Sequence, residues 1–386
     1  MANWQTVPMG ELCSIQSGKS DTKDAVADGP YAFFDRSKAI KRSSRFLRDC
    51  EALIIPGEGA EFLPRHFVGK FDLHQRAYAL FDFSSRIEVR YLYHYLHHVA
   101  DYFPRVAVGA TVKSLRLRHF DQLPVRLTDA ASQGRIVAIL DEAFEGIATA
   151  KANAQKSLQN ARELFELQLS VALRHGGKGW VEESIGDVCT LRSGTTVPVE
   201  LERPAGDVPY VKVAEMTLTA NRNGVTTSIR FLNRADIKPS WLIPAGAVIF
   251  PKRGGAILTN KKRLALVDMC ADLNIMSVIP SDRVTAEFLY LYFLTVDMRK
   301  LGTGSSIPQI NNYDIAPLPI SFPASRAMQA EVTEALRSAE SGCQALAAIY
   351  ERKLVALDVL KKSLLHQAFT GALTEKSADT QVAEVA

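Results

Sequence analysis

An internal duplication constrains the fold of this chain more than any other feature of its sequence, because repeated segments predict repeated structural units. The stretch WQTVPMGELCSIQSG at 4–18 aligns without a gap with WVEESIGDVCTLRSG at 180–194. Further matches follow in the same order: Pro30-Tyr31 with Pro209-Tyr210, 53–56 with 248–251, Asp72-Leu73 with Asp272-Leu273, 91–95 with 288–292, and 109–125 with 304–320. Matches that keep one order predict two modules built on one scaffold.

The two copies differ most in their middle parts. The second copy carries extra residues, mostly between Val213 and Ala247. Repeated edges around a divergent middle indicate one scaffold that presents two different surfaces. Two recognition modules with different targets would have this pattern.

Each copy ends in a segment with helical periodicity. Residues 130–173 contain no proline, and apolar residues recur there and in 325–373 at spacings of three and four. This pattern predicts long amphipathic helices that pack on one another. A helix of roughly 40 residues spans about 60 Å, which suits it to spacing two domains better than to filling one.

In the segments that precede these helices, short β-rich runs alternate with glycines and prolines. This pattern indicates strand-rich modules that mix helices and strands, with the fold class α/β (α+β). Strands are expected at 52–55, 78–83, 247–250 and 277–279. One helix per module is expected, near 90–102 and 286–301.

Composition places the chain among folded proteins of two or more domains, with 386 residues, 47% of them hydrophobic and 23% charged. A net charge of +4 permits nucleic-acid binding without requiring it. The five cysteines lack metal-ligand spacing, and a sparse, odd set favours reduced thiols. No apolar run approaches the ~18 residues of a membrane span, and residues 1–10 do not read as a signal peptide. We expect a soluble, cytoplasmic protein.

The order of module, helix, module and helix resembles the specificity subunit of type I restriction-modification systems over nearly the whole chain. The resemblance is carried by the opening Gly-(Asp/Glu)-hydrophobic-Cys…Ser-Gly of both copies, the Pro-Tyr pairs and the closing Leu-Pro-Val or Leu-Pro-Ile. Further marks are FDLHQRAYAL at 71–80, GTGSSIPQIN at 302–311 and LLHQAFTGAL at 364–373. The first copy departs from this pattern at 109–117, where it reads GATVKSLRL.

The resemblance implies two target-recognition domains, at 1–127 and 176–323, separated by two long helices, at 128–175 and 324–374, that pack antiparallel as a pseudo-two-fold repeat. Each domain would read one half of a split, asymmetric DNA site, and the helices would set the unread spacing. The helices would also dock two methyltransferase subunits that carry S-adenosylmethionine, and a motor-nuclease restriction subunit could join. The chain itself would hold no cofactor. The polar tail at 375–386 is expected to be disordered.

Reading DNA requires phosphate contacts for position and base-edge contacts for specificity, which Lys, Arg, Gln and Asn supply. The candidates in the first module are Ser17, Lys19, Arg36, Lys38, Lys41, Arg42, Lys113, Arg116 and Arg118. The candidates in the second module are Thr195, Thr196, Lys212, Lys252, Arg253, Lys261, Lys262, Ser305, Gln309, Asn311 and Asn312.

Lys252-Arg253-Gly254-Gly255 is the favoured single site, because it follows an expected strand and glycines let the backbone approach a phosphate closely. Each candidate also has a simpler interpretation. Single charges are often solvated surface, the glycine pair suits a hairpin turn, and the Ser-Gly loops suit β-turns with satisfied hydroxyls. Tyr31 and Tyr210 are interpreted as framework residues.

Signatures of catalysis are missing from the sequence. It has no Gly-x-x-x-x-Gly-Lys-(Ser/Thr) phosphate loop, no (Asp/Asn)-Pro-Pro-(Tyr/Phe) methyltransferase motif and no Gly-x-Ser-x-Gly elbow. His94 and His98 share a helical face but are interpreted as surface residues rather than metal ligands. Cys13 and Cys189 are interpreted as buried packing residues. We therefore predict no catalytic residues and no metal site.

Two alternatives to a DNA reader remain. A helical scaffold that bridges protein partners would explain the helices and the duplication but not the basic clusters. A nuclease or methyltransferase in one chain would need motifs that the sequence lacks.

Overall fold

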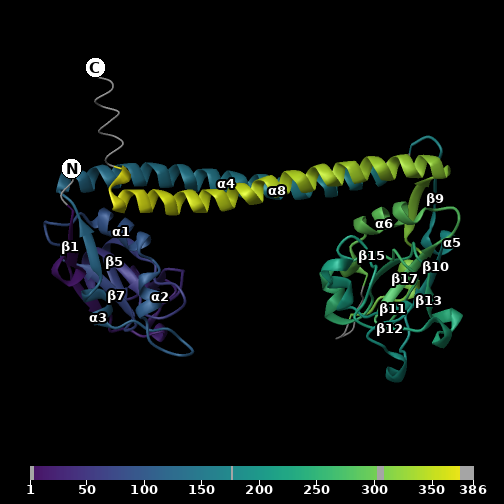
Figure 1. The fold of residues 1–386 in the computed structure, drawn as a ribbon, viewed down its shortest axis with the longest axis horizontal. Helices are drawn as coiled ribbons and strands as arrows, with labels where there is room; N and C mark the ends of the chain where they lie inside the picture. The colour runs from purple at the N-terminus through teal and green to yellow at the C-terminus, as the bar shows by residue number, and fades with distance from the viewer. Residues whose placement is uncertain (1–3, 175–176, 302–307, 374–386) are drawn as a thin grey trace, which may run out of the picture. The chain divides into compact units, whose positions relative to one another are not determined.

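The computed structural model describes residues 4–174, 177–301 and 308–373 (Figure 1). The chain forms two compact units, one of Met1–Gln155 with Glu351–Ala386 and the other of Lys156–Tyr350. Each unit holds one copy of the duplicated module together with parts of two long helices. The tail predicted at 375–386 lies outside the described residues.

The first module is built around a six-stranded sheet in the order β2-β7-β5-β6-β3-β4, and a separate pair joins β1 to β8. β3 and β6 run parallel, whereas β5 pairs antiparallel with both β6 and β7. Leu53 of β5 packs in one core with Tyr91 and Phe120 from the helices. The elements are β1 (Gln5–Pro8), β2 (Ser14–Ser17), β3 (Tyr31–Phe34), β4 (Lys41–Ser43), β5 (Arg48–Pro56), β6 (Arg65–Leu73), β7 (Ala77–Phe81), α1 (Val89–His98), α2 (Tyr102–Val106), α3 (Leu117–Asp121) and β8 (Pro124–Leu127).

The second module repeats this plan with one sheet in the order β10-β17-β14-β15, another in the order β12-β11-β16-β13, and the pair β18-β9. The short strands β12 and β13 flank β11 and β16. β12 pairs with β11 as β4 pairs with β3, and β13 pairs with β16 as the start of β5 pairs with β6. The elements are β9 (Trp180–Ser184), α5 (Ile185–Val188), β10 (Cys189–Ser193), β11 (Val208–Val211), β12 (Phe231–Leu232), β13 (Leu242–Ile243), β14 (Val248–Pro251), β15 (Arg263–Leu264), β16 (Met269–Ala271), β17 (Ile275–Pro280), α6 (Ala286–Thr295), α7 (Asn312–Ile315) and β18 (Pro319–Pro323).

Strand register corrects two of the sequence matches. His74 N–H donates to Phe34 O (2.9 Å), and Asp272 N–H donates to Val211 O (3.0 Å). The structural equivalent of Asp272 is therefore His74 rather than Asp72. By the same register the equivalent of Tyr210 is Phe33 rather than Tyr31, since Phe33 and Tyr210 hold matching places beside β6 and β16. A shift of two residues keeps every side chain on the same face of a strand, so the sequence pattern does not reveal it.

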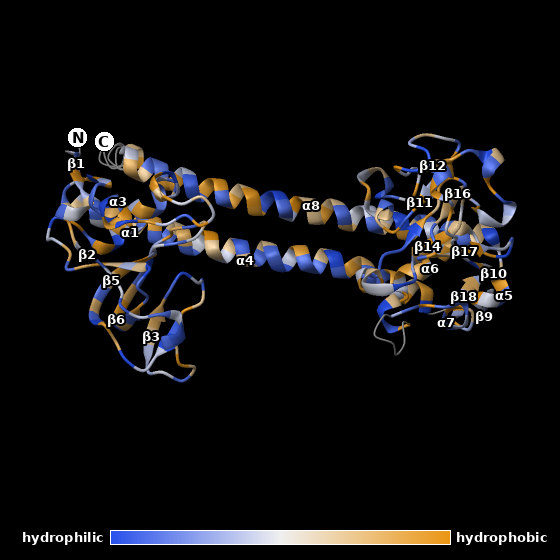
Figure 2. Cartoon of the chain, turned by 90° about the horizontal axis from the view of Figure 1, so that it is seen from below, coloured by the Kyte–Doolittle hydropathy of each residue, from blue (hydrophilic) through white to orange (hydrophobic). Residues whose placement is uncertain are grey.

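Two long helices follow the modules, α4 (Ala130–Arg174) and α8 (Arg326–Thr370), each of 45 residues. A helix of that length extends about 68 Å. In the first unit the two helices run antiparallel, because Lys151 pairs with Asp358 at 2.6 Å while Lys361 lies over the ring of Phe144. The predicted fold class is confirmed. Apolar and polar residues alternate along both helices, as Figure 2 shows.

The end of each long helix packs on a module from the other copy. Leu365 and Phe369 of α8 belong to the core of the first module, where Phe369 meets Tyr91 edge-on. In the same way, Leu169 and Leu173 of α4 belong to the core of the second module. The C-terminal motif at 364–373 is therefore a packing segment of the first module.

A buried glutamine fixes the start of each long helix. Gln133 donates from Nε2 to Arg86 O and Thr128 O, both at 2.9 Å, and its Oε1 accepts from the N–H that precedes α1. Gln329 makes the same three hydrogen bonds in the second module, to Arg283 O, Pro323 O and the Thr285 N–H. Because each buried amide is fully satisfied, it fixes the direction in which its helix leaves the module.

Candidate nucleic-acid interface

Four chain segments meet at one place in the second module, and most of the favoured candidates lie there. Lys252 donates from Nζ to Ser193 Oγ at 2.8 Å, which joins the loop after β14 to the end of β10. The backbone around Lys252 also accepts from Ile310 N–H (2.9 Å) and donates to Asn274 O (2.8 Å). The segment before α7 and the turn between β16 and β17 therefore border the same loop.

Polar side chains project from the segment before α7. Gln309 donates to Asn311 Oδ1 at 2.7 Å, and Asn311 donates to the hydroxyl of Tyr313 at 2.8 Å. Tyr313 is 70% exposed. The residue Arg253 is exposed and forms a β-bridge with Gln309. The structure thus places amide, phenol and guanidinium groups on one loop cluster, and these are the groups that bind base edges and phosphates.

The two backbone hydrogen bonds of Lys252, which we call the loop frame, recur at Gly57 in the first module. Gly57 N–H donates to Arg76 O (2.8 Å), as Lys252 N–H does to Asn274 O. Leu115 N–H donates to Gly57 O (2.8 Å), as Ile310 N–H does to Lys252 O. These hydrogen bonds are kept although the sequence departs at 109–117, so at Lys113–Leu115 the departure changes side chains and not the backbone pairing.

The glycines in these loops have two different roles. A Cβ on Gly18 would lie 1.9 Å from Leu73 O, and one on Gly194 would lie 2.0 Å from Asp272 O. The Ser-Gly motifs are therefore needed for close backbone packing. Gly254 has a positive φ of 70°, and a Cβ on Gly255 would meet no atom within 4 Å. The Lys252–Gly255 loop thus has open space on its outer side.

Exposure separates the predicted DNA-contacting residues into groups. Ten are exposed: Lys19, Arg36, Lys38, Arg42, Lys113, Arg116, Arg118, Thr196, Arg253 and Asn312. Others are half-buried: Ser17, Lys41, Thr195, Lys212, Lys252, Lys261, Gln309 and Asn311. Ser305 lies outside the described residues.

Three of these basic groups are held by their own module. Lys41 pairs with the buried Asp35 at 2.6 Å, and Lys212 pairs with Glu202 at 2.8 Å. Arg42 donates to Gly29 O at 2.7 Å, which ties the edge strand β4 to the preceding loop. Their charge is already used in stabilising the fold.

Lys262 is a correction to the prediction. It is only 3% exposed, and its ammonium donates to Asn260 Oδ1 at 2.8 Å. Burial lowers the pKa of Lys262 to about 8. A lysine that is enclosed in this way cannot neutralise a phosphate without a rearrangement, so we leave it out of the proposed interface.

Several residues of the loop cluster were missed by sequence reasoning. Arg76 and Asn274 occupy equivalent positions, because the N–H of each donates to the side chain two residues earlier, His74 Nδ1 and Asp272 Oδ1, at 3.0 Å. Glu58 holds the position equivalent to Arg253. Arg76 belongs to the motif FDLHQRAYAL at 71–80, so the sequence could have indicated it as a candidate contact.

His94 is a second correction, because it is buried rather than on the surface. Its Nε2 lies 2.7 Å from Asp141 Oδ1 on α4, and Arg90 shares the same carboxylate. Burial outweighs this carboxylate and lowers the pKa of His94. Across 4–174, 177–301 and 308–373, no group of three or more His, Cys, Asp or Glu is arranged to hold a metal ion.

The paired cysteines are confirmed as packing residues. Cys13 is 8% exposed and Cys189 is 9% exposed. Burial raises the pKa of each thiol to about 12. Both therefore stay protonated at neutral pH and are poor nucleophiles.

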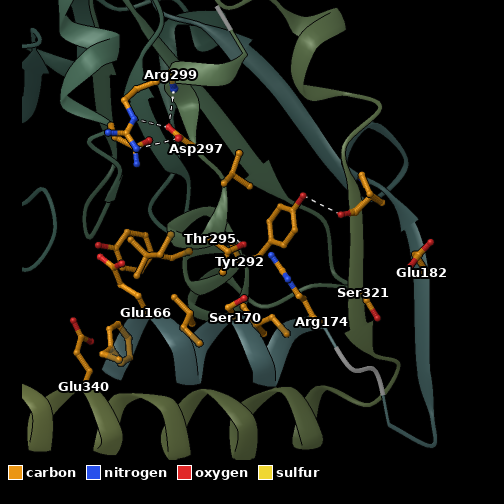
Figure 3. Close-up of a pocket in the computed structure, with 18 residues that line it drawn as sticks. Glu166, Ser170, Arg174, Glu182, Tyr292, Thr295, Asp297, Arg299, Ser321 and Glu340 are labelled. Carbon is orange, nitrogen blue, oxygen red and sulfur yellow. Dashed lines mark hydrogen bonds and ion pairs between the residues drawn. The ribbon is translucent and has the colours of Figure 1, made fainter. Parts of the chain in front are cut away.

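A cavity of about 760 Å³ lies in the second unit between the end of α4 and the second module (Figure 3). Tyr292 donates to Pro319 O on one wall, and Asp297 pairs with Arg299 on another. Glu166, Glu182 and Glu340 also line it. None of the predicted DNA-contacting side chains that the structure describes lines this cavity.

Among the described helices, none is both long enough and apolar enough to cross a membrane.

The fold and the loop cluster define a duplicated recognition protein, with two copies of one module whose matching loops carry different polar side chains. The family model described as the type I restriction modification DNA specificity domain matches residues 1–159 and 177–348. The chain therefore belongs to the family of type I restriction-modification DNA specificity proteins.

Relatives and solved structures agree with this family. The chain is 26% identical over 171 residues to the specificity subunit of type I restriction enzyme EcoDI from Escherichia coli, across 44% of this chain and 38% of that subunit. It is 24% identical over 231 residues to the putative type I specificity subunit S.MpnORF638P of Mycoplasma pneumoniae, across 54% of this chain and 59% of that protein. The matches thus span less than two thirds of either relative.

Two solved structures show the same fold at 15% identity, each across 95% of this chain and 97% of the other. One comes from a study of complex assembly and conformational transition in the type I R-M system, with a TM-score of 0.71. The other is the HsdS subunit from Thermoanaerobacter tengcongensis, with a TM-score of 0.58.

Proposed function

We propose that this chain is the non-catalytic specificity subunit of a type I restriction-modification complex and reads a bipartite, asymmetric DNA site. The observation that carries the proposal is the loop cluster. The same backbone hydrogen bonds recur in both modules, yet the side chains that they support differ, as Glu58 and Arg253 illustrate. A repeated frame with different side chains suits two readers of two different half-sites.

In this proposal residues 1–127 and 176–323 are the two target-recognition domains, and the helical segments 128–175 and 324–374 set the distance between the half-sites. A continuous helix suits a ruler because its rise per residue is fixed at about 1.5 Å. The exposed candidates other than Arg42 would contact the DNA, while Lys41, Arg42 and Lys212 would mainly hold their own loops.

The long helices also carry apolar side chains that the chain itself leaves exposed. Leu167 and Val171 of α4 are 62% and 52% exposed, and Val355 and Val359 of α8 are 64% and 60% exposed. Apolar groups of this kind support the docking of other subunits. The proposed partners are two methyltransferase subunits that carry S-adenosylmethionine, with restriction subunits joining them, in the cytoplasm.

A helical scaffold that binds no DNA is the alternative, and salt dependence separates the two. Phosphate contacts release counterions, so the affinity of a DNA reader falls steeply with salt. We expect the purified complex with methyltransferase to bind target DNA with such a slope. The double variant Lys252→Ala, Arg253→Ala should bind more weakly and with a shallower slope, while its melting temperature stays unchanged.

The matched control is Arg299→Ala, because Arg299 is a cation of the second module that already pairs with Asp297 and lines the cavity. It should bind DNA as the unaltered protein does. Affinity that is independent of salt, or equal in all three proteins, would favour the scaffold.

A further inference from the structure

The loops after β5 and β14 occupy the same place but carry opposite charges. Glu58 forms a β-bridge with Ser114, and Arg253 forms the equivalent bridge with Gln309. Gly59 N–H donates to Lys113 O (3.1 Å), as Gly254 N–H does to Pro308 O (2.8 Å). Since the backbones match on both sides of this position, the exchange of a guanidinium for a carboxylate changes the surface and not the fold.

The side chain of Glu58 is mostly buried, and the two arginines that contact it are exposed. Its side chain is 10% exposed, whereas those of Arg76 and Arg36 are 60% and 66% exposed. Arg76 donates from Nη1 to Glu58 Oε1, and Arg36 Nη1 lies 4.0 Å from Glu58 Oε2. The first module therefore also presents guanidinium groups here, supplied by neighbouring segments and held by an acid.

Arg76 borders a hollow on the first module. A concavity of about 420 Å³ is lined by Glu58, Arg76, Gln75, Tyr78 and Arg116, among others. Arg76 comes from the turn between β6 and β7, which is the position of Asn274 in the second module. Arg76 thus reaches the loop cluster from the turn between β6 and β7, whereas Arg253 belongs to the loop after β14.

The way in which Arg76 is held suits base reading better than phosphate binding. A phosphate contact depends mainly on net positive charge, part of which Glu58 neutralises. A base contact depends on orientation, and an arginine that is fixed at one nitrogen keeps a fork of N–H donors in a set direction. In the described part of the chain, Nε and Nη2 of Arg76 have no hydrogen-bond partner. Such a fork matches the O6 and N7 acceptors of guanine.

We propose that Arg76, positioned by Glu58, reads a guanine edge in the half-site of the first module, and that Arg253 has the matching role in the second. This inference rests on the proposed function. Arg76 would touch the DNA, whereas Glu58 would act through Arg76 as a positioning residue.

The experiment is selection from a duplex library by the purified complex with methyltransferase, followed by sequencing of the bound DNA. Arg76→Ala should lose about 5- to 150-fold of discrimination at one position of one half-site and leave the other half-site unchanged. Arg253→Ala should show the mirror-image result. Arg76→Lys keeps the charge but not the fork, so it should lose the same discrimination while retaining non-specific binding.

A neutral substitution separates reading from a merely structural role. Arg76→Gln keeps an N–H donor for Glu58 but not the guanidinium fork, so the melting temperature should stay close to that of the unaltered protein. The preference for guanine should still be lost, because the fork that matches O6 and N7 is missing. Arg105→Ala is the control, since Arg105 is a cation of the first module that is 69% exposed and is not among the proposed contacts.

A preference for guanine that persists in Arg76→Ala, Arg76→Lys and Arg76→Gln would overturn the inference and leave the proposed function intact. An unaltered complex that selects no split site would overturn both.

Discussion

At the scale of single residues, a cluster of histidines gives the first unit a dependence on pH. Burial, together with Lys361 and His94, lowers the pKa of His97 from 6.5 to about 4. A histidine whose pKa is lower in the folded state favours the neutral form, so the folded chain binds fewer protons than the unfolded chain. The stability that the neutral His97 side chain contributes to the fold is complete above pH 6.5. It is lost as the pH falls toward 4, because the unfolded chain then takes up a proton that the folded chain does not.

We predict that His97→Leu makes the first unit less sensitive to acid, because leucine does not take up a proton. The module should accept leucine there, since the matching position of the second copy is Leu294. The measurement is the melting temperature between pH 7 and pH 4. The variant should lose less stability over this range than the unaltered protein. His66→Leu serves as the control on β6, because His66 pairs with Glu51 outside the histidine cluster. An equal acid response in both variants and the unaltered protein would contradict the assignment.

The sequence predicts which kinds of residue belong to the site better than it predicts which of them pair with one another. The motif around Lys252 could be recognised because a strand, two cations and two glycines are adjacent in the chain. The link between Glu58 and Arg76 could not, since it joins residues 18 positions apart that meet only when β5, β6 and β7 form one sheet. Burial of Lys262 and His94 likewise depends on contacts from other segments.

At the scale of elements, the helices were the most predictable part of the fold. A period of three and four residues is a local signal, so the bounds of α4 and α8 fall close to the expected 130–173 and 325–373. The expected strands at 52–55 and 247–250 lie within or beside β5 and β14. Strand β6 was not predicted, because its outer half, Arg65–Lys70, mixes charged and apolar residues without a period of two and includes Gly69.

The ruler proposal makes a prediction at this scale. Four residues inserted in α4 after Gln155, and four in α8 after Tyr350, lengthen each helix by about 6 Å and about one turn. The unread spacer should grow by about two base pairs, because B-DNA rises about 3.4 Å per pair. Both half-sites should be unchanged. The control replaces four residues at each point with alanine, and an unchanged spacer in the lengthened protein would rule out a ruler.

At the scale of the whole chain, the duplication links fold to function. Each long helix begins at a buried glutamine of its own module and ends in the core of a module from the other copy. The beginning and the end of the chain therefore pack together, because the N-terminal module and the C-terminal end of α8 share one core. In such an arrangement the two modules share one backbone plan while their loop side chains differ.

We propose that this chain directs modification to a split, asymmetric DNA site. Genome-wide sequencing of modified bases in the host, with and without the gene, would test this proposal. We predict that deletion removes one methylated motif made of two short half-sites around an unread spacer, and that the gene restores it. A methylation pattern that is identical with and without the gene, in cells that express the methyltransferase partner, would contradict the claim.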